Sequence, residues 1–171
     1  MKNFFIDKLN VVQDHYSNGL RLVGKELLIR VDLETGEKTE TPTKLQLEGS
    51  YSSSLMIRCN GSKVEVYGNP SRYQRIDNLY GYTTFDQCIA VYNQVLLKLD
   101  LPPFTKCKKL MSVQNHENKV VNWIADGACI KHVDFTKNHV VGQGNEQDFL
   151  KALSGQTIGR AIKPYLYPNG N

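Results

Sequence analysis

The sequence predicts an α+β fold in which one principal helix packs across an antiparallel β-sheet. Three observations lead to this fold class. Short segments of alternating polar and apolar residues fill the first half of the chain. One longer segment, residues 84–99, has helical spacing of its apolar residues. The pair Asn60-Gly61 separates two alternating segments, and Asn-Gly in that position is the strongest short hairpin signal.

The expected strands come first in chain order. The alternating or β-branched segments predict strands at residues 6–12, 25–33, 44–48, 54–59 and 63–67. The second strand should stop at the turn-forming cluster of residues 34–37. The last two strands should form a hairpin around Asn60-Gly61, because both residues tolerate a positive φ.

The helix of residues 84–99 has signals at both ends. Its apolar face is formed by Phe85, Cys88, Ile89, Tyr92, Val95, Leu96 and Leu99. Thr84 followed three residues later by Gln87 is a capping-box pattern. Pro102 and Pro103 cannot continue a helix, so it should end before them.

The C-terminal third predicts a second group of strands. Residues 107–113 and 119–124 should pair as a hairpin, and residues 127–136 should join them as a third antiparallel strand. Asn145 should cap a short helix at residues 146–153. Residues 157–166 are expected to be extended.

Length and composition limit the classes of protein. A chain of 171 residues fits one domain, residues 1–171, with residues 102–103 as the candidate hinge. No apolar run is long enough to span a membrane or to act as a signal peptide, so we expect no membrane partner and a cytoplasmic location. The four cysteines are scattered, which argues against a disulfide framework or a structural zinc site.

Positive charge is concentrated in one interval. The net charge is +4. Residues 106–137 contain only three acidic residues but six lysines, which are Lys106, Lys108, Lys109, Lys119, Lys131 and Lys137. Such a surface attracts polyanions, although mild basicity is common in proteins without a nucleic-acid partner.

His132 and Asp134 are the candidate metal ligands. They lie two residues apart in an expected buried strand, so both side chains should point to one face, with Lys131, Val133 and Phe135 on the other. A histidine and a carboxylate suit Mg²⁺ or Mn²⁺ when phosphate oxygens complete the coordination. The same pairing also occurs by chance. His15, His116 or His139 would be further ligands, and His139 is the first choice because it follows the strand directly.

The C-terminal residues offer a candidate nucleophile and phosphate ligands. Tyr165 or Tyr167 would conserve a phosphodiester bond in a covalent intermediate, although tyrosines near prolines usually pack. Arg160 and Lys163 flank them and would neutralise phosphate, although terminal cations are often only solvated.

Four segments together resemble a known family. They are residues 5–9 (FIDKL), residues 79–84 (LYGYTT), the end of the helix at residues 95–97 with Leu101-Pro102, and residues 130–136 (IKHVDFT). In this order and spacing they resemble the replication initiators of filamentous phages, the gene II/X-type family that includes the RstA-like proteins. Asp134 matches the family pattern, whereas His132 stands where arginine is common.

The resemblance implies a rolling-circle replication initiator, which binds the phage origin and nicks one DNA strand with the help of Mg²⁺ or Mn²⁺. The sheet would be related to HUH-type nickase sheets, Asp134 with His132 would hold the metal, and DNA would contact Lys131, Lys137, Arg160 and Lys163. The nucleophilic tyrosine of the family would fall beyond Asn171. Host replication proteins would be further partners in the bacterial cytoplasm. The alternatives are a non-catalytic protein that occupies origin DNA, or an interaction module without a nucleic-acid role.

Overall fold

The computed structural model describes residues 4–16, 19–48, 54–75 and 80–156. The chain divides into two compact units, residues 1–137 and residues 138–171, and each is described by itself. Arg160, Lys163, both C-terminal tyrosines and the expected strand at residues 157–166 lie outside the described residues. One domain over residues 1–171 with a hinge at residues 102–103 stays a prediction.

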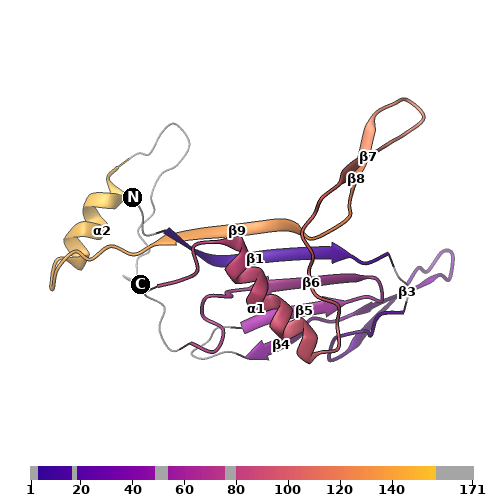
Figure 1. The fold of residues 1–171 in the computed structure, drawn as a ribbon, viewed down its shortest axis with the longest axis horizontal. Helices are drawn as coiled ribbons and strands as arrows, with labels where there is room; N and C mark the ends of the chain where they lie inside the picture. The colour runs from indigo at the N-terminus through magenta and orange to yellow at the C-terminus, as the bar shows by residue number, and fades with distance from the viewer. Residues whose placement is uncertain (1–3, 17–18, 49–53, 76–79, 157–171) are drawn as a thin grey trace. The chain divides into compact units, whose positions relative to one another are not determined.

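A five-stranded antiparallel sheet forms the first unit. Its strand order is β4-β5-β6-β1-β9 (Figure 1). The strands are β1 (Phe4–Asp14), β4 (Leu45–Glu48), β5 (Ser54–Cys59), β6 (Lys63–Gly68) and β9 (Cys129–Lys137). The predicted hairpin at Asn60-Gly61 is confirmed, because β5 and β6 pair in antiparallel register and Gly61 has a φ of 100°. The predicted α+β class is therefore confirmed.

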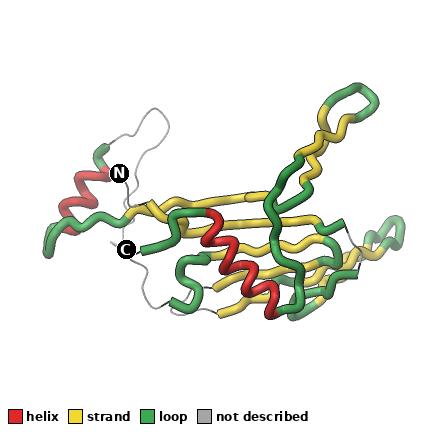
Figure 2. The backbone as a smooth tube through the Cα atoms, in the orientation of Figure 1, coloured by secondary structure: helices red, strands yellow, loops and turns green. Residues whose placement is uncertain are grey.

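The principal helix, α1 (Phe85–Lys98), packs across one face of this sheet (Figures 1 and 2). Thr84 is its N-cap and accepts a hydrogen bond from the backbone N–H of Gln87, as the capping box predicts. Cys88, Tyr92, Val95 and Leu96 are its buried residues. They share a core with Leu9, Val11, Leu55, Ile57, Val64 and Val66 of the sheet. We call the sheet face covered by α1 the core face and the opposite face the outer face.

Two separate hairpins complete the first unit. Strands β2 (Leu27–Val31) and β3 (Lys38–Pro42) pair around a turn at residues 32–36, where a turn was predicted. Strand β3 was not predicted because its residues, KTETP, lack the apolar alternation of a half-buried strand. Strands β7 (Leu110–Gln114) and β8 (Val120–Ala125) form the second hairpin, as predicted.

Strand β9 does not join that second hairpin, so the predicted three-stranded sheet of residues 107–136 is wrong. It pairs with β1, and Val133 lies opposite Leu9 while Ile130 lies opposite Val11. The physical reason is burial: on β1, Val133 packs against the main core, whereas beside the exposed β7–β8 hairpin it would contact no core. Most side chains of β9 are partly or fully exposed, so the prediction of a buried strand is also wrong.

The second unit contains one described helix, α2 (Glu146–Ser154). Asn145 is its N-cap residue, as predicted, but its side chain donates to the carbonyl of Val141 rather than capping the helix. The rings of His139 and Phe149 lie 6.2 Å apart in this unit. No helix among the described residues of either unit is long and apolar enough to cross a membrane.

Candidate metal and nucleic-acid site

The candidate site lies on the outer face of the sheet, on strands β1 and β9. Residues directly opposite each other in an antiparallel pair share a face. Asn10 lies opposite His132, and Lys8 lies opposite Asp134. The side chain of Asn10 donates to Glu65, which is not among the buried residues of the core, so this row faces away from α1.

His132 and Asp134 point to the same face, as predicted, and their side chains meet. The Nε2 atom of His132 lies 2.8 Å from Oδ1 of Asp134. Both side chains are about half exposed, at 56% and 44%. Two ligands on adjacent corners of an octahedron with metal–ligand distances near 2.1 Å lie about 3.0 Å apart. The 2.8 Å contact is a hydrogen bond between the two side chains, so a shared Mg²⁺ or Mn²⁺ would have to replace the proton between Nε2 and Oδ1 at nearly the same separation.

A β-bulge changes the orientation of the residue before this pair. The register of β1 and β9 shifts between Asn10 and Val11, and Lys131 is the extra residue on β9. Lys131 lines a groove together with Val12 and Glu65. It therefore lies on the outer side, and the predicted strict alternation, which put Lys131 with Val133, is wrong here. Bulges commonly re-aim a side chain next to a functional site.

Two residues of β1 extend the site, and sequence analysis missed both. Oδ1 of Asn10 is buried and has no hydrogen-bond partner among the described residues. Buried polar atoms are normally satisfied, so an orphan amide oxygen opposite His132 fits a ligand position for a hard cation. Lys8, an exposed cation, is paired in register with Asp134.

Of the other predicted histidine ligands, His15 and His116 do not join the pair, and His139 belongs to the second unit. Among the described residues, no group of three or more His, Cys, Asp or Glu side chains is placed to hold a metal. His15 follows β1, His116 lies in the β7–β8 turn, and His139 contacts Phe149 in the second unit. A metal at His132 and Asp134 would therefore take its remaining ligands from Asn10, water or a phosphate.

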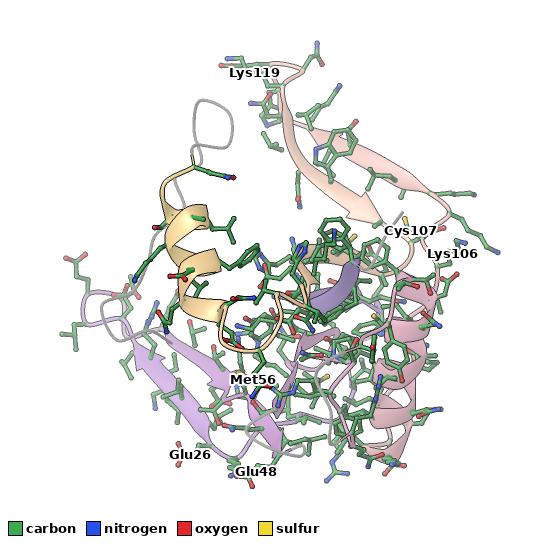
Figure 3. All side chains as sticks on the ribbon, turned by 90° about the vertical axis from the view of Figure 1, so that its left-hand side faces the viewer. Glu26, Glu48, Met56, Lys106, Cys107 and Lys119 are labelled. Atoms are coloured by element: carbon green, nitrogen blue, oxygen red, sulfur yellow. The ribbon has the colours of Figure 1, made fainter. Side chains whose placement is uncertain are left out.

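Of the predicted DNA-binding cations that the structure describes, Lys131 lies beside the pair, whereas Lys137 shares the opposite face of β9 with Phe135, whose ring contacts Phe85 of α1. Lys131 precedes His132, and Lys137 ends β9, with its Nζ atom 5.6 Å from the centre of the exposed Phe4 ring. Arg160 and Lys163 lie outside the described residues. Lys106 lies near the base of the β7–β8 hairpin and Lys119 near its tip (Figure 3).

The buried tyrosine of α1 is structural. The hydroxyl of Tyr92 donates to the carbonyl oxygens of Leu9 at 2.7 Å and Gly68 at 3.1 Å. Burial raises the pKa of Tyr92 far above its usual value, so it stays protonated. It ties the helix to β1 and β6 and is unsuited to act as a nucleophile.

Fold and site together define an α+β protein with a two-residue candidate metal site beside lysines, an arrangement suited to a phosphate polymer. Over 116 residues the chain is 46% identical to a replication-associated protein of Escherichia phage If1. The match covers 68% of this chain and 36% of that relative, so the chain spans about a third of the relative's length. No family model matches the chain, and no solved structure matches it significantly. The predicted resemblance to filamentous-phage replication initiators is thereby confirmed for the matched part.

Proposed function

We propose that this chain takes part in phage DNA replication as the origin-binding and metal-binding part of a rolling-circle initiator. The observation that carries the proposal is the pair of His132 and Asp134, 2.8 Å apart on the outer face. The identity with a replication-associated phage protein supports it. The substrate would be origin DNA, and host replication proteins in the bacterial cytoplasm would be further partners.

The residues of the site divide the work of strand nicking between them. Asp134 and the neutral imidazole of His132 would hold Mg²⁺ or Mn²⁺, and Asn10 would add an amide oxygen. The cation, when bound, would polarise the scissile phosphate and stabilise the charge that develops on it. Lys8 and Lys131 would bind neighbouring phosphates and fix the strand across the sheet. A tyrosine would supply the nucleophile: its oxygen would lose a proton and bond to the phosphorus, the bond from phosphorus to the 3′ oxygen would break, and the 3′ oxygen would take up a proton, leaving the 5′ phosphate on the tyrosine.

The experiment measures metal binding and strand nicking separately. Mn²⁺ binding to the chain is followed by isothermal titration, and nicking by relaxation of supercoiled plasmid carrying the phage origin. Asp134→Ala should abolish Mn²⁺ binding, and Glu40→Ala, at an exposed carboxylate on β3 of the separate β2–β3 hairpin, should leave it unchanged. Mn²⁺ binding that survives Asp134→Ala would refute the metal assignment.

A non-catalytic protein that occupies origin DNA is the second candidate function. It is favoured by the hydroxyl of Tyr92, which is buried and bonded to the carbonyl of Leu9 and is therefore not free to attack a phosphate. This candidate predicts origin binding that weakens with salt but no nicking by the chain, while a longer chain continuing past Asn171 nicks the same plasmid. Nicking by the chain itself would exclude it.

A further inference from the structure

A groove on the outer face lies next to the metal pair. Its volume is about 560 Å³, and its walls come from strands β1, β5, β6 and β9 on one side and strand β8 on the other. Its lining includes Tyr16, Arg58, Glu65, Trp123 and Lys131. With Lys63 and Asp14, which also line it, the groove combines two aromatic rings, three cations and two carboxylates.

The wall formed by β8 is fixed to the sheet by hydrogen bonds at the base of the hairpin. The Tyr16 hydroxyl donates to the carbonyl of Ala125 at 2.8 Å. One carboxylate oxygen of Asp126 accepts from the backbone N–H groups of Lys108 and Lys109, at 2.7 and 2.8 Å. The backbone N–H of Ala128 donates to Thr105 at 2.8 Å. These bonds hold the groove's second wall in place at its base, the Ala125 end of β8.

The aromatic side chains of the groove are accessible to a ligand. Trp123 is 59% exposed and Tyr16 is 61% exposed. Exposed aromatic planes beside cations are the arrangement on which the bases of single-stranded nucleic acids stack. Arg58 and Glu65, 2.9 Å apart, line the same groove and provide hydrogen-bonding groups for the polar edge of a base.

The groove continues into the candidate metal site. Val12 lines the groove, and Asn10 is the next residue of β1 on the same face, about 7 Å along the strand. Asn10 lies opposite His132. Lys131, which lines the groove, directly precedes His132 in the chain. The spacing between the groove and the metal pair is thus short enough for one nucleotide to place its base in the groove and a phosphate at the pair.

We propose that this groove binds one nucleobase of single-stranded DNA, stacked on Trp123, next to the phosphate held at His132 and Asp134. The inference rests on the proposed function and adds a base-binding position to it. A base inside a duplex presents only its edges, so stacking on Trp123 requires an unpaired base. Lys131 lies between the groove and the pair and would bind the connecting phosphate.

The test uses the fluorescence of Trp123, because it is the single tryptophan of the chain. Short oligothymidylates, and copies with one abasic position moved along the strand, are titrated against the protein. Stacking should quench the emission, and one abasic position should remove the quenching and weaken binding about ten-fold. Trp123→Ala should weaken binding of the intact strand by a similar factor, and Trp123→Phe should retain most of the affinity.

Leu110→Ala is the matched control, since Leu110 lies on the same hairpin, is 60% exposed and does not line the groove. It should bind like the unchanged chain. Circular dichroism checks that each variant is folded. Unchanged emission at saturating oligonucleotide, equal affinity for all abasic positions, or quenching by duplex DNA alone would overturn the inference.

The outcomes also separate this inference from the proposed function. Asp134→Ala should lose Mn²⁺ binding and keep the quenching, whereas Trp123→Ala should keep Mn²⁺ binding. Mn²⁺ binding at the pair without any effect on Trp123 refutes the base position alone. Absence of both Mn²⁺ binding and oligonucleotide binding refutes the proposed function and, with it, the groove assignment.

Discussion

Asn10 on β1 lies directly opposite His132 on β9, and the amide oxygen of Asn10 is buried without a hydrogen-bond partner among the described residues. An unsatisfied buried acceptor costs about 1–3 kcal/mol, so a cation that used this oxygen would relieve a penalty already present in the fold. This relationship places a third candidate ligand beside His132 and Asp134 and leads to the first prediction.

Asn10→Ala should weaken Mn²⁺ binding about ten-fold, because it removes one oxygen ligand and leaves the histidine and carboxylate in place. Asn10→Asp should strengthen binding, since it adds a charged oxygen at the same point. Isothermal titration measures both. Gln46→Ala is the control: Gln46 lies opposite Met56 at the other edge of the sheet and should not affect the affinity. Equal weakening by Ala and Asp would indicate a purely structural Asn10.

Sequence patterns predicted the parts of the fold that depend on local chemistry. The capping box of Thr84 and Gln87, the prolines after α1 and the Asn60-Gly61 turn each act within a few residues, and each was confirmed. The partner of β9 was not predictable in the same way, because it depends on which distant strand offers Val133 a core to pack against.

The candidate site, like the fold, was predictable only where it depends on neighbouring residues of one strand. Period-two geometry put His132 and Asp134 on one face, and the structure confirms it. The bulge at Lys131 and the positions of Asn10 and Lys8 follow from the register of two strands more than 100 residues apart. A sequence pattern fixes which residues share a face of one strand, whereas register decides which residues of another strand join them.

Tyr92→Phe should lower the free energy of unfolding by about 1–2 kcal/mol. The substitution removes a buried hydroxyl that bonds the carbonyl oxygens of Leu9 and Gly68, and it leaves both oxygens without that donor. Urea denaturation followed by circular dichroism gives the value. Tyr80→Phe, at a position 74% exposed, should change the stability by much less. An unchanged midpoint for Tyr92→Phe would show that the hydroxyl does not tie α1 to the sheet.

Acid should destabilise the fold in part through His15. Burial lowers the pKa of His15 below its usual value of 6.5, an effect opposed by the charge of Asp14, and Nε2 of His15 is buried without a partner among the described residues. The folded state then binds the proton less readily than the unfolded state. The stabilisation is complete above pH 6.5 and is lost as the pH falls from 6.5 towards the lower folded-state pKa.

His15→Gln should therefore reduce the loss of stability between pH 7.5 and pH 5, measured as the shift of the urea midpoint. His116→Gln, in the exposed β7–β8 turn, serves as the control and should keep the pH dependence of the unchanged chain. A His15→Gln variant that loses as much stability as the unchanged chain would contradict the role assigned to this burial.

The carboxylate of Asp126 should slow hydrogen exchange of two backbone amides at the base of the β7–β8 hairpin. Hydrogen bonds from the backbone N–H groups of Lys109 and Lys108 lower the pKa of Asp126. Asp126→Ala removes the acceptor, so both amide protons should exchange with solvent faster in NMR measurements, while Asp126→Asn, which keeps one oxygen, should give intermediate rates. Amide protons of α1, such as that of Leu96, should exchange as before in both variants. The same bonds hold one wall of the groove, so Asp126→Ala should also reduce the quenching of Trp123 by oligothymidylate. If the amides of Lys108 and Lys109 exchanged at normal rates in Asp126→Ala, contacts other than this carboxylate would fix the hairpin.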